Sequence, residues 1–170
     1  MLALFETLLD IIRLRKGPDA IPYSWLLCLL SLVLWMFAGL VTMLLFDELT
    51  DQDYIVGTFV GVVGLACYAA LVVTTGHTPR LLQVLTAVLG CGALISVLFV
   101  ASRVFLAPVI GTNFANFVAT LILLWSVPVE GHIMARAIDR HWYVGIVVAM
   151  AVFIFQYYLL YVLDPTPAAA

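Results

Sequence analysis

The sequence predicts an all-α membrane protein, a bundle of five transmembrane helices preceded by an amphipathic interfacial helix. Hydrophobic residues make up 65% of the 170 residues, and the mean hydropathy is +1.19. Charged residues make up only 10%, whereas an average soluble domain carries roughly 25%. The apolar residues gather into runs of about twenty, the length that crosses ~30 Å of hydrocarbon. This composition excludes a soluble domain and also a disordered chain, which would need low hydrophobicity and high charge.

Residues 1–16 are predicted to form the amphipathic helix. Its apolar residues recur at helical spacing on one stripe: Leu2, Phe5, Leu8, Leu9 and Ile12. Three basic residues, Arg13, Arg15 and Lys16, follow at its end, where they complement the helix dipole. We expect this helix to lie in the membrane interface as an anchor. The alternative is that the three basic residues dock a partner or anionic lipid.

Residues 17–24 form a short connector that contains Gly17 and Pro18, and residues 25–163 form the transmembrane domain. The five predicted spans lie at about 25–46, 54–75, 81–102, 114–133 and 143–163. Polar or turn-forming residues separate them: an acidic stretch at 47–53, a Gly- and Pro-containing stretch at 76–80, Pro108 with Gly111, and the charged residues around Arg140. Residues 164–170 are predicted to be an extracytoplasmic tail.

The distribution of Lys and Arg predicts the orientation of the bundle. With five spans, six of the seven basic residues fall on one side, and Arg103 alone falls on the other. We therefore expect a multi-pass protein of a bacterial inner membrane with a cytoplasmic N-terminus and a periplasmic C-terminus.

Small residues mark the faces through which the helices are expected to pack, because close backbone approach drives helix association in lipid. The second span carries Gly57, Gly61 and Gly64 on one face, with Tyr68 beyond them, and the fifth span carries Gly145 and Ala149. The same faces would also serve a homo-oligomer.

Ionisable residues inside spans are costly and are functional candidates by default. The candidate polar cluster lies near the end of the fourth span, with one amide on the fifth: Glu130, His132, Arg136 and Gln156. We expect Glu130 to be an anchor that pairs with Arg136, with Arg80 or with a residue near the connector. A role in proton handling or ligand binding for Glu130 and His132, or partner binding by this patch, is the alternative. Gln156 is expected to make an interhelical hydrogen bond.

No cofactor or metal site is expected. The three cysteines lie inside apolar runs without CxxC spacing, and the three histidines match no zinc-binding pattern. A net charge of −3 gives no basic surface for nucleic acid. The expected partners are the lipid bilayer and either another membrane protein or further copies of this chain.

Five spans, an internal N-terminus, an external C-terminus and a proline late in the fourth span together resemble the Yip-type membrane proteins. Residues 8–22, with Gly17 and Pro18, and residues 130–138, with Gly131 and His132, look more specifically like an uncharacterised proteobacterial inner-membrane family. The resemblance implies an inner-membrane helix bundle without an assigned role.

Three functions compete. The leading hypothesis is a non-enzymatic scaffold or accessory subunit of a membrane assembly, because intramembrane charge is scarce while the N-terminal helix and a basic patch are available to partners. The second is a small oligomeric transporter or channel that uses Glu130, Gln156 and Tyr157. The third is a lipid-modifying enzyme that acts at the cytoplasmic face through Glu130 and His132.

Overall fold

The computed structural model describes residues 2–46 and 51–163, which form six α-helices and two short 3₁₀ turns and contain no strand. The helices are α1 (Leu2–Ile12), α2 (Trp25–Leu45), α3 (Asp51–Thr74), α4 (Leu81–Ile110), α5 (Thr112–Ala137) and α6 (Trp142–Leu163). Five of them, α2 to α6, are long and apolar enough to cross a membrane, which confirms the all-α helical bundle. Part of the predicted acidic stretch and the whole predicted tail lie outside the described residues.

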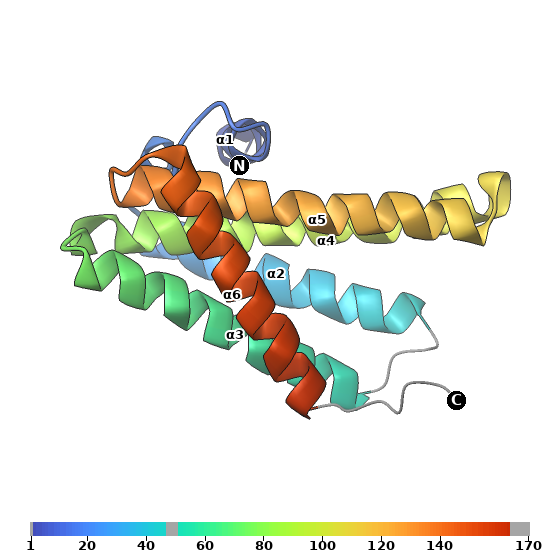
Figure 1. Cartoon of the computed structure of the whole chain (residues 1–170). Coiled ribbons are helices and arrows are strands. Elements are labelled where there is room, and N and C mark those ends of the chain that lie inside the picture. The colour runs from blue at the N-terminus through green and yellow to red at the C-terminus, as the bar shows by residue number, and fades with distance from the viewer. Residues whose placement is uncertain (1, 47–50, 164–170) are drawn as a thin grey trace.

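The longest elements, α4 and α5, form an antiparallel hairpin that runs the length of the molecule (Figure 1). The predicted break at Pro108 is wrong, because α4 continues through that residue to Ile110. A backbone in hydrocarbon keeps its hydrogen bonds within the helix, so a proline in the last turn does not release the chain. The helix ends at Gly111, whose φ of +101° is readily adopted by glycine, and α5 begins at the next residue.

The other long helices surround this hairpin unequally. The helix α2 packs along α4, whereas α6 crosses α5 and then reaches α3 (Figure 1). We call the end that carries Arg80, Arg136 and Arg140 the basic end, and the opposite end, where α4 joins α5, the Gly111 end. The α5 helix runs through Pro128 and ends at Ala137, later than the predicted 133, so the basic end is built from longer helices than expected.

The α1 helix lies crosswise on α4 and α5, where Figure 1 shows it end-on. Ile11 is fully buried and Leu8 nearly so, whereas Phe5 is half exposed. The predicted stripe therefore describes the buried face only in part. The reason is that α1 contacts α4 over a small area centred on Gly90. The Leu8 side chain approaches this glycine so closely that a Cβ on Gly90 would lie 2.8 Å from it. The indole nitrogen of Trp125 also donates a hydrogen bond to the Ile12 carbonyl at 3.1 Å.

The connector between α1 and α2 is held by side chains of the hairpin. Its short 3₁₀ turn, Pro18–Ala20, is followed by the fully buried Ile21. The amide nitrogen of Gln83 donates a hydrogen bond of 2.6 Å to the Ile21 carbonyl. The α1 helix and the connector thus belong to the packed core, which lies toward the basic end.

Candidate functional site

The only hydrogen bond described for the Glu130 carboxylate comes from another helix. The Tyr68 hydroxyl of α3 donates to Oε2 of Glu130 on α5 at 2.6 Å, and Tyr68 is 2% exposed. This length is typical of a hydroxyl that donates to an ionised carboxylate. The expected pairing of Glu130 with Arg136, Arg80 or the connector is wrong, since no ion pair of the described residues involves Glu130. Arg80 pairs instead with Asp139, with its Nη1 2.8 Å from Oδ1.

Gln156 approaches the same region from α6. Its amide nitrogen donates to the Val60 carbonyl of α3 at 3.3 Å, which confirms the predicted interhelical hydrogen bond. The amide lies against Gly64, so closely that a Cβ at that position would overlap it. Tyr157 does not join this group, because its side chain is 68% exposed.

Glu130, Tyr68 and Gln156 line a small space inside the bundle, which we call the Glu130 cavity. Its volume is about 70 Å³. A water molecule occupies about 30 Å³ in the liquid, so the cavity has room for roughly two waters. The remaining walls are apolar or glycine: Trp35, Gly61, Gly64, Leu65, Val88, Leu89 and Gly92. Among the residues that the structure describes, the cavity has one carboxylate and no basic side chain in its wall.

The rest of the predicted polar cluster points elsewhere. Each residue of an α-helix turns the side chain by about 100°, so positions 130 and 132 fall on different faces. His132 is buried against the connector, with Nε2 3.1 Å from the Lys16 carbonyl. Arg136 has an exposed side chain at the basic end. The structure therefore brings together Glu130 and Gln156, and it separates both from His132 and Arg136.

The basic end is closed by Arg80. Besides its ion pair with Asp139, the guanidinium donates to the carbonyls of Arg136 and Ala137 at 3.1 and 3.2 Å, and so caps the C-terminus of α5. Nε2 of His77 lies 3.5 Å from Oδ2, the other carboxylate oxygen of Asp139. The hydrogen bond from Arg80 lowers the pKa of the Asp139 carboxyl below its usual value, and the charges of Arg80 and His77 act in the same direction.

The three basic residues after α1 have different surroundings. Lys16 forms an ion pair of 2.8 Å with Asp10, and this hydrogen bond lowers the pKa of the Asp10 carboxyl. Arg13 and Arg15 have exposed side chains. The predicted docking cluster thus presents two arginines on the surface, beside a helix that is packed against the bundle.

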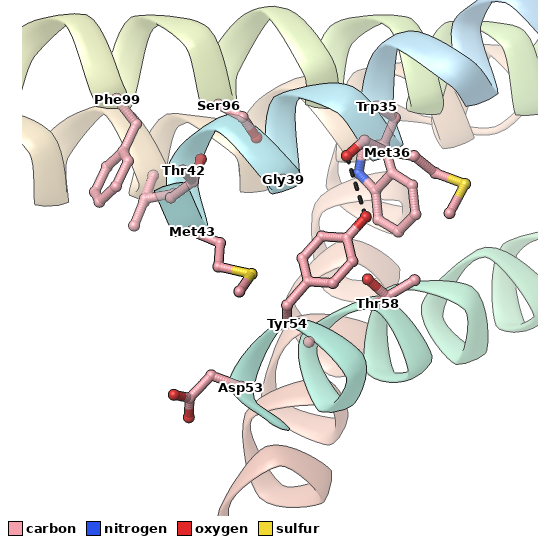
Figure 2. Close-up of a pocket in the computed structure, with 12 residues that line it drawn as sticks. Trp35, Met36, Gly39, Thr42, Met43, Asp53, Tyr54, Thr58, Ser96 and Phe99 are labelled. Atoms are coloured by element: carbon pink, nitrogen blue, oxygen red, sulfur yellow. Dashed lines mark hydrogen bonds between the residues drawn. The ribbon is translucent and has the colours of Figure 1, made fainter. Parts of the chain in front are cut away.

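A second, larger space lies between α2 and α3 toward the Gly111 end, and we call it the Tyr54 pocket (Figure 2). Its volume is about 290 Å³. Figure 2 shows aromatic, methionine and hydroxyl side chains around it, with Asp53 at its edge. The Tyr54 hydroxyl donates to the Met36 carbonyl of α2 at 3.3 Å and bridges the two helices below the indole of Trp35.

Trp35 belongs to the walls of both spaces. A Cβ at Gly61 would lie 2.6 Å from Cζ2 of the indole, and a Cβ at Gly92 would lie 3.3 Å from its Cδ1. The ring therefore occupies the volume that side chains at these two positions would fill. One feature of the sequence points to Trp35: tryptophan is enriched at membrane interfaces, whereas this one lies in the middle of a span.

The predicted packing glycines divide into three kinds. Gly145 and Gly131 bring the backbones of α6 and α5 into contact, and Ala149 is fully buried one turn later. Gly61 and Gly64 make room for side chains, those of Trp35 and Gln156. Gly57 differs from the expectation, since nothing lies within 4 Å of a Cβ built there and the residue lines the Tyr54 pocket.

Comparisons of the chain with protein-family models, with curated proteins and with solved structures find no match. The resemblance to Yip-type proteins therefore stays a prediction. Among the described residues, no group of three or more histidine, cysteine or carboxylate side chains could hold a metal ion.

Proposed function

We propose that this chain is a small membrane carrier or channel that binds a positively charged species, a proton or a small cation, at Glu130. The observation that carries the proposal is the setting of Glu130: a carboxylate inside a helix bundle, beside a cavity that has no basic side chain in its described wall. A carboxylate at membrane depth is costly, and such residues characteristically mark ion pathways and proton relays.

The hydrogen bond from Tyr68 supports this role. A hydroxyl donor favours the ionised form of Glu130 and brings no positive charge of its own, so a proton or a small cation can still balance the carboxylate. The Gln156 amide adds a polar group that can orient water in the same cavity. The cavity is formed by helices of one chain, so the proposed site does not require a second copy.

The proposal includes an orientation. We place the basic end in the cytoplasm of a bacterial inner membrane, because six of the seven basic residues fall on that side of a five-span chain. The Glu130 cavity then lies nearer the cytoplasmic face, about two helical turns from the end of α5, and the Tyr54 pocket faces the periplasmic half.

The test is a flux assay in proteoliposomes with gradients of protons, Na⁺, K⁺ and methylammonium applied in turn. A pH-sensitive dye reports protons and methylammonium, and ion-selective dyes report Na⁺ and K⁺. Glu130→Gln should lose at least nine-tenths of the flux, because the amide carries no negative charge and does not take up a proton near neutral pH. Glu6→Gln is the matched control, since Glu6 is an exposed carboxylate on α1. If no gradient produces flux above that of empty liposomes, the carrier proposal is wrong.

One observation favours a second function, that of an accessory subunit in a membrane assembly. The α1 helix is packed on the hairpin, and the turn that follows it presents Arg13 and Arg15 at the surface, where an acidic partner could bind. A photoreactive amino acid at position 13 should then crosslink in cells to one defined membrane protein. Crosslinking to lipid alone would contradict this second function.

A further inference from the structure

We infer that the Tyr54 pocket binds an amphipathic organic cation, an apolar body with one ammonium group, and that the Trp35 indole separates this pocket from the Glu130 cavity. The inference of a binding site in the Tyr54 pocket does not depend on the proposed function. The role of Trp35 as a partition rests on the proposed function, because a partition matters only if something passes between the two spaces.

The lining of the pocket suits such a ligand. Three aromatic rings and two thioethers surround it: Trp35, Tyr54, Phe99, Met36 and Met43. Aromatic faces attract ammonium groups, and methionine adapts its shape to an apolar body. The hydroxyls in the wall are partly engaged by the protein itself, since Thr42 donates to the Ala38 carbonyl at 2.8 Å. The pocket therefore offers mainly aromatic and apolar surface, which indicates a ligand with few hydrogen-bonding groups.

The charges around the pocket favour a cation. Asp53, in the first turn of α3, lies at its edge and is the one charged residue among the described residues of its wall. The basic residue of this region, Arg103, lies over the ring of Phe46, 4.4 Å from the ring centre. Phe46 is not among the lining residues and meets the pocket through an edge contact with Phe99. The same end of the bundle thus already holds one cation against an aromatic ring, outside the pocket.

The two volumes decide what each space can hold. About 290 Å³ is at the lower end of the range for small-molecule sites, whereas about 70 Å³ accommodates only water and small ions. An organic cation therefore fits the Tyr54 pocket, whereas the Glu130 cavity is too small for it, and the indole that lines both spaces lies against Gly61 and Gly92. Movement of Trp35 would join the two spaces.

Binding is tested with benzyltrimethylammonium by calorimetry on the full chain in lipid nanodiscs, with neopentylbenzene, its uncharged isostere, as competitor. Asp53→Asn should weaken binding about fivefold, and Asp51→Asn, the neighbouring exposed carboxylate outside the pocket wall, should leave it unchanged. Gly57→Leu should weaken binding at least tenfold, because its side chain enters open pocket space. Equal competition by neopentylbenzene, or unchanged affinity in both Asp53→Asn and Gly57→Leu, overturns the inference.

The partition is tested by flux of benzyltrimethylammonium. Trp35→Ala should raise its flux at least tenfold, and Trp35→Phe, which keeps a ring against the two glycines, should raise it less. No increase in either folded variant overturns the role of Trp35. Glu130→Gln should still bind the cation in the Tyr54 pocket while proton flux is lost. If the native chain binds benzyltrimethylammonium but transports no species, the proposed function is wrong and the binding site in the Tyr54 pocket is still supported. If the native chain transports protons but does not bind this cation, the inferred binding site is wrong and the proposed function is still supported.

Discussion

The Tyr68 hydroxyl and the Glu130 carboxylate join α3 to α5 by a hydrogen bond of 2.6 Å within a bundle of five long, mainly apolar helices. We expect Tyr68→Phe to remove this bond without changing the packed volume. Because hydrogen bonds to charged groups contribute about 1.5–3 kcal/mol, the variant should unfold at a lower denaturant concentration and lose most of its flux. Tyr157→Phe, at an exposed position of α6, should match the native chain in both measurements. Equal stability of the two variants would show that the hydrogen bond between Tyr68 and Glu130 does not stabilise the bundle.

The contact between α5 and α6 depends on two glycines. A Cβ on Gly145 would overlap the Gly131 carbonyl oxygen and lie 2.7 Å from the Ala135 Cβ. Gly145→Ala should therefore destabilise the bundle by about 1–3 kcal/mol, as overpacking does, measured by unfolding in mixed detergent micelles. Gly57→Ala is the matched control, because nothing lies within 4 Å of its added Cβ, and it should be neutral or slightly stabilising. The opposite ranking would show that α5 and α6 do not pack as described.

The packing of α1 against the hairpin can be weakened by a substitution at Trp125. Trp125→Phe removes the hydrogen bond to the Ile12 carbonyl, a loss of about 1 kcal/mol. A loss of this size raises the fraction of chains in which α1 is detached from the hairpin about fivefold. Trypsin should therefore cleave after Arg13 and Arg15 about five times faster. Trp142→Phe, at an exposed position at the start of α6, should leave the cleavage rate unchanged. Cleavage at the native rate in Trp125→Phe would show that α1 is held by its apolar contacts alone.

The ion pair between Arg80 and Asp139 gives the basic end an acid-sensitive contact. The pKa of Asp139 is lowered in the folded chain, so its stabilisation is present above the ordinary value near pH 4 and is lost as the pH falls through the folded pKa. Asp139→Asn should therefore lower the Tm at pH 7 and leave it unchanged near pH 2. The difference should be small, because Asp139 is exposed and Arg80 keeps its bonds to two backbone carbonyls. Asp51→Asn is the control, and a Tm difference that persists at pH 2 would contradict this account.

The sequence predicted the elements of the fold better than their ends. Apolar runs of membrane length gave all five long helices, because lipid imposes both their length and their polarity. Proline was misleading, since Pro108 lies within the last turn of α4 and the positive φ of Gly111 ends the helix instead. Local rules could not show how far a helix continues when its backbone has no water to bind.

The candidate site was predicted only in part, because it depends on which helix faces which. Glu130 and Gln156 were found from the cost of polar groups in a membrane. Their common cavity was not found, since it requires α6 to cross α5 and reach α3. Tyr68 was predicted only to share a face with the glycines of α3, and no role was predicted for Trp35. The role of Gly61 becomes clear only once the indole of Trp35 is seen against it.

The most direct test of the central claim is the initial rate of proton flux in Glu130→Gln relative to Glu6→Gln, in liposomes with equal amounts of folded protein. We expect a ratio below about one-tenth, because Glu130 is the one carboxylate in the described wall of the cavity and the substitution removes its charge. A ratio near one, with flux well above that of empty liposomes, would show that the positive species does not bind at Glu130.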